Sequence, residues 1–482
     1  MSTPRASSLS LEDRIYGCWL GKSIGGTLGL PCEGRMERQN YTYYDPVPVS
    51  APPNDDLELQ LVWLHLVESR GSELTPGDFA GAWLRHIHYM WDEYGVCRWN
   101  LRRGVPIDQV GTFENPFHAA MGSPIRSEIW ACLFPGDPDS ATHYAAMDAS
   151  LDHGVEGIAG EVFFAAMQSL VLGGTPLREA VSLALDRIPP ASEMARALRQ
   201  VLGLHADGVE VWACWNDLLA VHGHENFTHA PLNVALTLWA LLYGGEDFEK
   251  SILLATNGGY DTDCTAATVG ATLGMAGADS IPKRWKEPIG EGIYVGPGIL
   301  DIDAPATLGE LTRRTLAQIG RLARKPGTDI CHADPISPSD LKELPGTIAI
   351  QPAGGFSSVA WANGELPVAV KMAGGATWNW DVAHNEPRYL VCLARRGAKL
   401  YVDGELAVHC PPLLPYVPAP HRCPKEARVL LTPGAGSHAV RLELDSREEG
   451  QDATVMLAYP DLHLCPWTAQ ELPDRARLIS RS

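Results

Sequence analysis

The sequence lacks the features that direct a protein to a membrane or to the cell exterior. No apolar run is long enough to span a bilayer, and the polar stretch 1–10 contains no apolar signal core. The eleven cysteines are scattered without paired spacing, so they do not indicate a disulfide framework. Because the cysteine count is odd and no secretion signal is present, we expect reduced thiols and a cytoplasmic protein.

Positive charge is also scarce. The chain has 38 Lys and Arg residues against 58 Asp and Glu residues, which gives a formal net charge of −20. This charge repels nucleic acids and anionic membranes, so we expect neither as a general partner. It also disfavours a pyrophosphate-containing substrate unless a local basic or helix N-terminal pocket binds it. The candidate cations near the acidic motifs described below are Lys22, Arg35 and Arg126.

The chain length and patterning predict more than one domain. A length of 482 residues and a hydrophobic content of 45% allow two or three packed domains. Helical spacing of apolar residues ends before the segment 325–346, whose four prolines indicate a linker. The period then becomes two, with short strand candidates and turn signals typical of a β-sandwich. We therefore predict an all-α domain over 1–324, a linker over 325–346 and a jelly-roll-like β-sandwich over 347–482.

Two acidic helix starts are the most informative local patterns. Asn54, Asp55 and Asp56 open one predicted helix, whereas Asp261 and Asp263 follow a glycine pair at the start of another. Neighbouring carboxylates repel each other unless a cation or a proton lies between them. Each pattern alone is most simply a helix cap. Two such patterns in one helical domain suggest a shared metal site.

A third motif precedes these two. In the segment 17–33 the glycines Gly17, Gly21 and Gly25 line one face of a predicted helix, which indicates close approach of another helix, and Glu33 follows in a loop. With the motifs 54–56 and 258–265, this order resembles the ADP-ribosylglycohydrolase family, which includes dinitrogenase-reductase-activating glycohydrolase. The resemblance covers roughly residues 10 to 320.

The resemblance implies an all-helical cleft that binds divalent cations. It implies two Mg²⁺ ions, with Mn²⁺ as an alternative. The implied metal ligands are Asn54, Asp55, Asp56, Asp261, Asp263, Cys264 and Thr265. Glu33 is implied to be a proton-transfer or water-orienting carboxylate, with Asp55 and Asp56 also in the catalytic set.

Four further residues are candidate substrate contacts: Arg126, His153, His229 and Asn233. Proteins of the resembling family have a histidine in a similar helix, which supports His153. A buried histidine bonded to a nearby aspartate explains His153 equally well. For His229 and Asn233 the alternative is a role at the start of the following helix.

Several positions depart from the family pattern. Asn54 and Leu57 stand where threonine is usual, Tyr260 is inserted before Asp261, and Cys264 replaces a metal-site threonine. A thiol is a poor ligand for Mg²⁺, so Thr265 or water could substitute, or one cation could be lost. These departures, together with the added β-domain, suggest a substrate other than an ADP-ribosylated protein.

The resulting prediction is a Mg²⁺-dependent glycohydrolase. It would cleave an N- or O-glycosidic bond at the anomeric carbon of a ribosyl-like sugar, in an ADP-ribosyl conjugate, a nucleoside or a small furanoside. A non-catalytic ADP-ribose or glycan binding protein and a crystallin-like structural protein are the alternatives. Retention of Glu33 and of the four motif aspartates argues against a binder without activity. If the protein forms an oligomer, we expect the C-terminal domain to make the contact.

Overall fold

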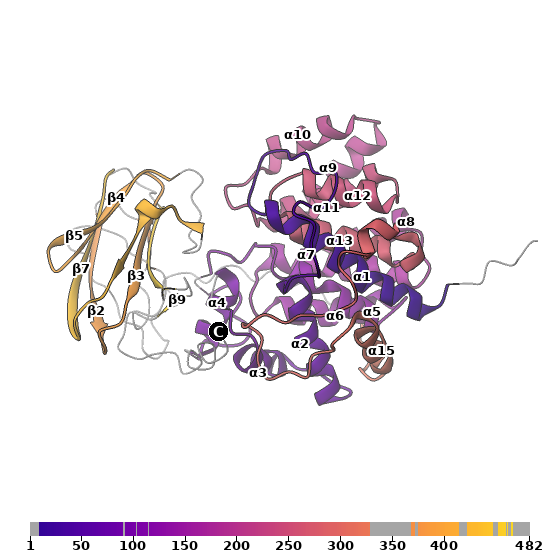
Figure 1. The fold of residues 1–482 in the computed structure, drawn as a ribbon, viewed down its shortest axis with the longest axis horizontal. Coiled ribbons are helices and arrows are strands. Elements are labelled where there is room, and N and C mark those ends of the chain that lie inside the picture. Colours follow the sequence, from indigo (N-terminus) through magenta and orange to yellow (C-terminus); the bar gives the residue numbers. More distant parts are fainter. Residues whose placement is uncertain are drawn as a thin grey trace, which may run out of the picture. The chain divides into compact units, whose positions relative to one another are not determined.

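The computed structural model describes residues 9–89, 92–102, 104–113, 115–327, 368–371, 375–413, 422–446, 452–458, 460 and 464–465. The chain forms two compact units, which are described separately (Figure 1). The first contains 1–87 and 117–334, and the second contains 88–116 and 335–482. The sequence did not predict that 88–116 packs with the C-terminal part of the chain.

The first unit is helical, as predicted. Its α-helices are α1 (Leu11–Gly29), α2 (Asp55–Arg70), α3 (Pro76–His86), α5 (Ser127–Leu133), α6 (Pro138–Ala149), α7 (Val155–Leu172), α8 (Leu177–Leu185), α9 (Glu193–Ala206), α10 (Val211–His222), α11 (Ala230–Gly244), α12 (Phe248–Asn257), α13 (Thr262–Gly274), α14 (Lys283–Lys286) and α15 (Leu308–Gln318). Side chains cap many of these helices. Ser10, for example, accepts a hydrogen bond from the Asp13 N–H in a capping box at the start of α1.

Helices α1 and α13 pack unusually closely, and this contact positions the candidate site (Figure 1). A Cβ atom on Gly21 would overlap the carbonyl oxygen of Gly270, and one on Gly270 would overlap that of Gly21. Farther along α1, a Cβ atom on Gly29 would overlap the backbone of Thr262. The glycine face predicted from sequence therefore serves close helix approach, and it brings the end of α1 to the start of α13.

Helix α7 belongs to the core of this unit. By length and composition it is the single helix among the described residues that could cross a membrane, but 78% of that stretch is buried inside the fold. It packs against α5, α6 and α8. Burial on all sides explains its apolar composition, because a helix that is hydrophobic all round is typical of a core position.

The second unit combines a helix with two antiparallel sheets. Its elements are α4 (Asp92–Arg102), β1 (Val368–Lys371), β2 (Gly375–Val382), β3 (Arg388–Ala394), β4 (Ala398–Val402), β5 (Glu405–Cys410), β6 (Arg428–Leu431), β7 (Gly436–Leu444), β8 (Asp452–Ala458) and β9 (Leu464–Cys465). One sheet has the order β1-β8-β3-β6 with β9 on β8, and the other has the order β2-β7-β4-β5. An ion pair of 2.9 Å joins Asp92 of α4 to Arg422.

The two sheets share one hydrophobic core, which agrees with the predicted β-sandwich. Leu390 of β3 and Val455 of β8 come from one sheet, and Leu400 of β4 and Val440 of β7 come from the other. Asp403 and Gly404 join β4 to β5 in a hairpin. The predicted linker beyond residue 327 and the first part of the predicted β-domain, 347–367, lie outside the described residues.

Candidate metal centre

Acidic side chains from three parts of the first unit meet at one place. Glu33 follows α1, Asp56 lies in the first turn of α2, and Asp261 and Asp263 lie at the start of α13. They form two overlapping triads, Asp56–Asp263–Cys264 and Glu33–Asp261–Asp263. In each triad one ligand atom from every residue lies within 4.8 Å of the others. The two acidic helix starts therefore converge, and Asp263 is common to both triads.

The turn before α13 holds the Glu33 loop in place. Gly259 and Tyr260 both have positive φ angles, 72° and 68°. The Tyr260 N–H donates a hydrogen bond to the Arg35 carbonyl at 2.8 Å, and the Tyr260 carbonyl accepts one from the Gly34 N–H at 2.9 Å. Tyr260, which departs from the family pattern, thus forms part of the connection that brings Glu33 to α13.

One oxygen of each of two buried carboxylates has no hydrogen-bond partner among the described residues. Asp56 is 1% exposed and Asp263 is 4% exposed, and within the described chain Asp56 Oδ2 and Asp263 Oδ1 have no hydrogen-bond partner. Burial, opposed by Lys22, raises the pKa of Asp56 to about 7. Burial is the main cause that raises the pKa of Asp263 well above its usual value, and the negative charges of Glu33 and Asp261 raise it further. Unpaired buried charge is costly, so this donor set fits a divalent cation.

Cys264 contributes a sulfur atom to this oxygen-rich cluster. Burial and the neighbouring Asp261 and Asp263 raise the pKa of the Cys264 thiol well above its usual value. The thiol therefore keeps its proton in the absence of a cation. A cation that binds to the sulfur must displace that proton.

Three predicted metal ligands lie outside the two triads. The Asn54 side chain caps α2, where its Oδ1 accepts a hydrogen bond from the Asp56 N–H at 2.7 Å. The Thr265 hydroxyl is buried and donates to the Thr262 carbonyl at 3.3 Å. Asp55 is half-buried and adds negative charge near the centre. The ligand roles of these three residues stay predictions.

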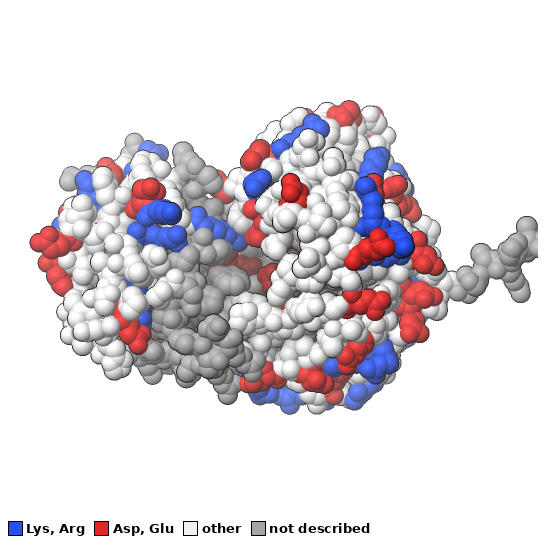
Figure 2. All heavy atoms as spheres, in the orientation of Figure 1, with Lys and Arg blue, Asp and Glu red and all other residues white. Residues whose placement is uncertain are grey.

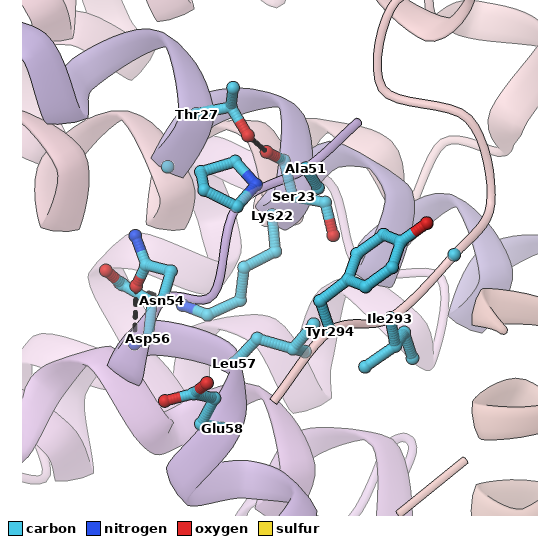
Figure 3. A pocket seen from close by; sticks show the side chains of 13 residues that line it. Lys22, Ser23, Thr27, Ala51, Asn54, Asp56, Leu57, Glu58, Ile293 and Tyr294 are labelled. Carbon is cyan, nitrogen blue, oxygen red and sulfur yellow. Dashed lines mark hydrogen bonds and ion pairs between the residues drawn. The ribbon is translucent and has the colours of Figure 1, made fainter. Parts of the chain in front are cut away.

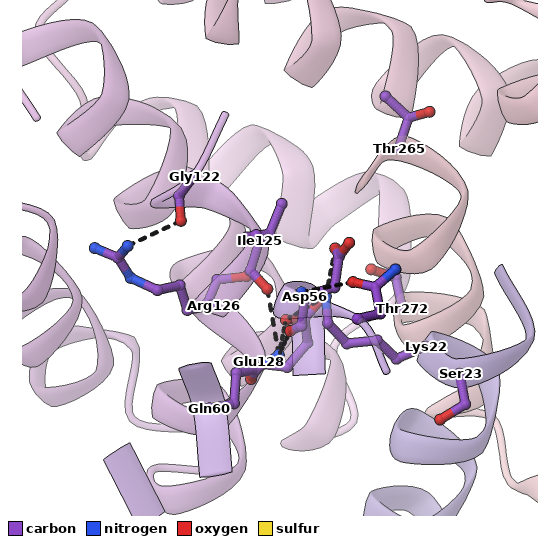
Figure 4. Close-up of polar contacts among 12 residues, drawn as sticks. Lys22, Ser23, Asp56, Gln60, Gly122, Ile125, Arg126, Glu128, Thr265 and Thr272 are labelled. Carbon is purple, nitrogen blue, oxygen red and sulfur yellow. Dashed lines mark hydrogen bonds and ion pairs between the residues drawn. The ribbon is translucent and has the colours of Figure 1, made fainter. Parts of the chain in front are cut away.

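A buried lysine, which the sequence analysis considered only as a phosphate-binding cation, lies beside the acidic cluster (Figure 4). Lys22 Nζ lies 3.4 Å from Asp56 Oδ1 and 3.1 Å from Glu128 Oε2. Gln60 and Gln168 also donate to Glu128, at 2.9 and 3.3 Å. Lys22 is thus engaged in an internal polar network. The one sequence signal for it is a charged residue in the middle of an otherwise apolar helix.

A small pocket adjoins this network (Figure 3). Lys22, Asn54 and Asp56 line one part of it, and Ile293 and Tyr294 line another. Its volume of about 20 Å³ suffices for one water molecule.

We predict that Lys22→Met destabilises the protein by about 3–5 kcal/mol, because Glu128 would remain as an uncompensated buried carboxylate. The double variant Lys22→Met/Glu128→Gln removes Lys22 and one of its two carboxylate partners, so it should recover part of that loss, while Asp56 stays buried without the lysine. Chemical denaturation of metal-free protein measures both effects. Equal stability of wild type and Lys22→Met would contradict the assignment of a buried ion pair.

Arg126 and His153, two predicted substrate contacts, belong to a second buried network. The Arg126 guanidinium lies 2.9 Å from Asp148, 2.7 Å from Asp152 and 4.0 Å from Glu161, and all four side chains are fully buried. His153 Nδ1 lies 2.8 Å from Asp152. Burial alone would raise the pKa of Asp152, but Arg126 and His153 lower it to about 2. The contacts favour a structural role for both residues, and substrate contact stays a prediction.

His229 and Asn233 lie at the start of α11, as the alternative interpretation expected. Asn233 Oδ1 accepts a hydrogen bond from the Asp261 N–H at 3.2 Å, and its Nδ2 donates to the carbonyls of Phe227 and His229. Asn233 therefore positions Asp261, a role that the sequence did not reveal. The His229 ring stacks on His224 at 4.0 Å, and burial lowers the pKa of His229 to about 3.

On the face shown in Figure 2, Lys and Arg side chains of the helical unit do not gather in one patch. Lys and Arg side chains there are interspersed with Asp and Glu side chains over the helical unit. Close to the acidic centre, Lys22 and Arg126 are both buried against carboxylates. Arg35 is exposed on the loop that follows Glu33.

The helical fold and the convergence of two acidic helix starts define a class of all-α proteins with a carboxylate centre suited to divalent cations. The family model described as ADP-ribosylglycohydrolase matches residues 7–324. The chain belongs to the ADP-ribosylglycohydrolase family. Membership supports a hydrolase that acts on glycosidic bonds.

The chain is also similar to two individual proteins. An uncharacterized protein of Archaeoglobus fulgidus is 26% identical over 296 residues, which are 58% of this chain and 92% of that protein. A solved structure described as an ADP-ribosylglycohydrolase-related protein complex is 23% identical. The similarity covers 64% of this chain and 97% of that one, with a TM-score of 0.45.

Proposed function

We propose that the protein is a divalent-metal-dependent glycohydrolase that cleaves an N- or O-glycosidic bond at the anomeric carbon of a ribosyl-like sugar. The observation that carries this proposal is the pair of triads that share Asp263, in which a buried oxygen of Asp56 and one of Asp263 have no hydrogen-bond partner within the described part of the chain. Candidate substrates are ADP-ribosyl conjugates, nucleosides and small furanosides.

The chain offers two overlapping donor sets, which share Asp263, for two cations. Glu33, Asp261 and Asp263 would hold one cation, and Asp56, Asp263 and Cys264 would hold the other. When bound, the cations would orient sugar hydroxyls and polarise the reacting oxygens. Asn233 holds the backbone of Asp261, so the first donor set is supported from α11.

Glu33 is the residue best placed to transfer a proton. It is exposed, whereas Asp261 and Asp263 are buried. In the proposed reaction its carboxylate accepts a proton from the attacking water, and its carboxyl form returns a proton to the leaving group.

We predict that Glu33→Gln lowers turnover by about a hundredfold or more, the usual contribution of an acid–base group. The amide keeps the size of the side chain and an oxygen that can ligate a cation, but it cannot carry the proton. Mg²⁺ affinity measured on the same variant separates loss of the acid–base group from loss of a ligand. The assay is Mg²⁺-supported cleavage of ADP-ribosyl-arginine, O-acetyl-ADP-ribose, nucleosides and aryl ribofuranosides. Glu37→Gln is the matched control, because Glu37 is exposed on the same loop and belongs to neither triad.

The outcome also separates the proposed enzyme from the alternatives. Turnover of one substrate class that is lost in Glu33→Gln and kept in Glu37→Gln supports the proposal. Binding of cations and of ADP-ribose or glycans without turnover of any tested compound would instead favour a binding protein. Near wild-type turnover in Glu33→Gln would remove Glu33 from the mechanism.

A further inference from the structure

The two triads of the candidate centre differ in their chemistry. Glu33, Asp261 and Asp263 offer oxygen atoms alone, whereas Asp56 and Asp263 are joined in the other triad by the sulfur of Cys264. Cys264 is 8% exposed, so its sulfur is shielded from bulk solvent. The centre thus contains one position with hard oxygen ligands alone and a second position whose ligands include a softer sulfur atom.

Donor atoms of these kinds select different cations. Mg²⁺ prefers oxygen ligands and near-ideal octahedral geometry, and it usually keeps several waters. Thiolates instead favour borderline and soft cations such as Zn²⁺ and Co²⁺. Three protein ligands with one open position are the usual arrangement of a catalytic Zn²⁺ site. The set Asp56–Asp263–Cys264 has that number of ligands.

The carboxylate oxygens of the same triad are a second, independent indication that a ligand binds there. Asp56 Oδ2 and Asp263 Oδ1 are buried without a partner in the described chain, and both belong to residues of this triad. Lys22 contacts the other oxygen of Asp56, Oδ1, at 3.4 Å. The lysine therefore leaves Oδ2 as the available donor.

The distances suit a small cation. The three ligand atoms lie within 4.8 Å of one another. At the tetrahedral angle of such a site, Zn–S and Zn–O bonds of about 2.3 and 2.1 Å place the sulfur and the oxygen about 3.6 Å apart. Side-chain movements of up to about 1 Å therefore close the site.

We propose that the centre is asymmetric, with a thiophilic divalent cation such as Zn²⁺ or Co²⁺ at Asp56–Asp263–Cys264. The Glu33–Asp261–Asp263 position takes Mg²⁺ or Mn²⁺. This inference rests on the proposed function, because it assumes that the acidic cluster binds cations. Cys264 is the residue that sets the preference of its position.

The experiment titrates the full-length, metal-free protein with Co²⁺ and follows near-ultraviolet absorption and heat of binding. A Co²⁺–thiolate bond gives a charge-transfer band that oxygen ligation does not give. We expect one equivalent of Co²⁺ to produce this band, Zn²⁺ to abolish it, and excess Mg²⁺ to leave it unchanged. These measurements on the wild-type protein do not depend on any variant.

Variants then assign the sulfur. Cys264→Ser should lose the band and bind Zn²⁺ more than about 100-fold more weakly, because loss of an outer-shell partner alone costs 10- to 100-fold. It should still bind Mg²⁺ at the oxygen-only position. Cys214→Ser is the matched control, because Cys214 is also a buried free cysteine and belongs to neither triad.

The possible failures are distinguishable. Co²⁺ binding without a charge-transfer band, or a band that persists in Cys264→Ser, would overturn the asymmetric centre and leave the proposed metal dependence intact. If neither Co²⁺ nor Mg²⁺ binds the wild-type protein, the proposed function fails together with this inference.

Discussion

Replacement of Asp263 by asparagine is expected to abolish divalent-cation binding at both positions of the centre while the helical unit stays folded. Asp263 is the residue shared by the two triads, so no other single side chain serves both. Asparagine preserves the volume of the side chain and removes its charge. We expect cation affinity to fall by more than the roughly 100-fold that loss of an outer-shell partner costs.

The same change is expected to stabilise the metal-free protein at neutral pH. Burial and the charges of Glu33 and Asp261 raise the pKa of Asp263 in the folded state. Such a carboxyl group contributes stability that is fully present below its unfolded-state pKa of about 3.9 and is lost as the pH rises through the folded-state value. The free energy of unfolding of Asp263→Asn should therefore exceed that of wild type increasingly as the pH rises above about 4.

Calorimetric titration with Mg²⁺ and Zn²⁺, and denaturation of metal-free protein between pH 4 and neutrality, test the two parts. Asp279→Asn is the control, because Asp279 is exposed and lies outside both triads. Unchanged cation affinity in Asp263→Asn would exclude Asp263 from the centre. A stability difference that does not grow with pH would contradict its buried, charge-crowded environment.

The parts of this site that sequence could predict depend on local patterns. Glycine at every fourth position of α1 signals that another helix packs closely, and α13 meets that face. Acidic residues crowded at the starts of α2 and α13 signal a need for a counter-charge, and the structure brings the two starts together. The change of period after the helical unit similarly predicted the sheets.

The remaining parts depend on contacts between residues that are distant in sequence. Lys22 pairs with Glu128, and nothing in the neighbourhood of either residue identifies the other. Asn233 of α11 accepts a hydrogen bond from the Asp261 N–H at the start of α13, and the whole of α12 separates the two residues in sequence. The packing of 88–116 with the second unit, marked by the Asp92–Arg422 ion pair, has the same origin.

Position within a motif does not by itself distinguish a helix cap from a metal ligand. Asn54 and Thr265 lie in the acidic motifs, but their oxygens take part in hydrogen bonds of the helix starts. The same residue types serve capping and oxygen ligation, because both tasks need a short side chain with a polar oxygen atom. Sequence alone does not separate these two uses.

The second large predicted effect is the loss of stability when Arg126 is replaced. Arg126→Met is expected to destabilise the protein by about 5 kcal/mol, because breaking a buried ion pair typically costs 3–5 kcal/mol and Arg126 serves more than one carboxylate. Its guanidinium donates to Asp148 at 3.0 Å and to Asp152 at 2.7 Å. Without the cation, those carboxylates would be buried without compensation.

The conservative variant Arg126→Lys discriminates between the structural role and the predicted role in substrate binding. Lysine keeps the charge but cannot reproduce the forked geometry with which Arg126 contacts two aspartates, so we expect a stability between those of wild type and Arg126→Met. The control is Arg35→Met, because Arg35 is an exposed arginine after Glu33, and this change should leave the free energy of unfolding unchanged.

If Arg126→Met keeps wild-type stability and loses affinity for substrate alone, Arg126 contacts the substrate and the buried network does not stabilise the fold. A large loss of stability that Arg126→Lys partly restores instead identifies Arg126 as the charge that allows three acidic residues, Asp148, Asp152 and Glu161, to be buried together.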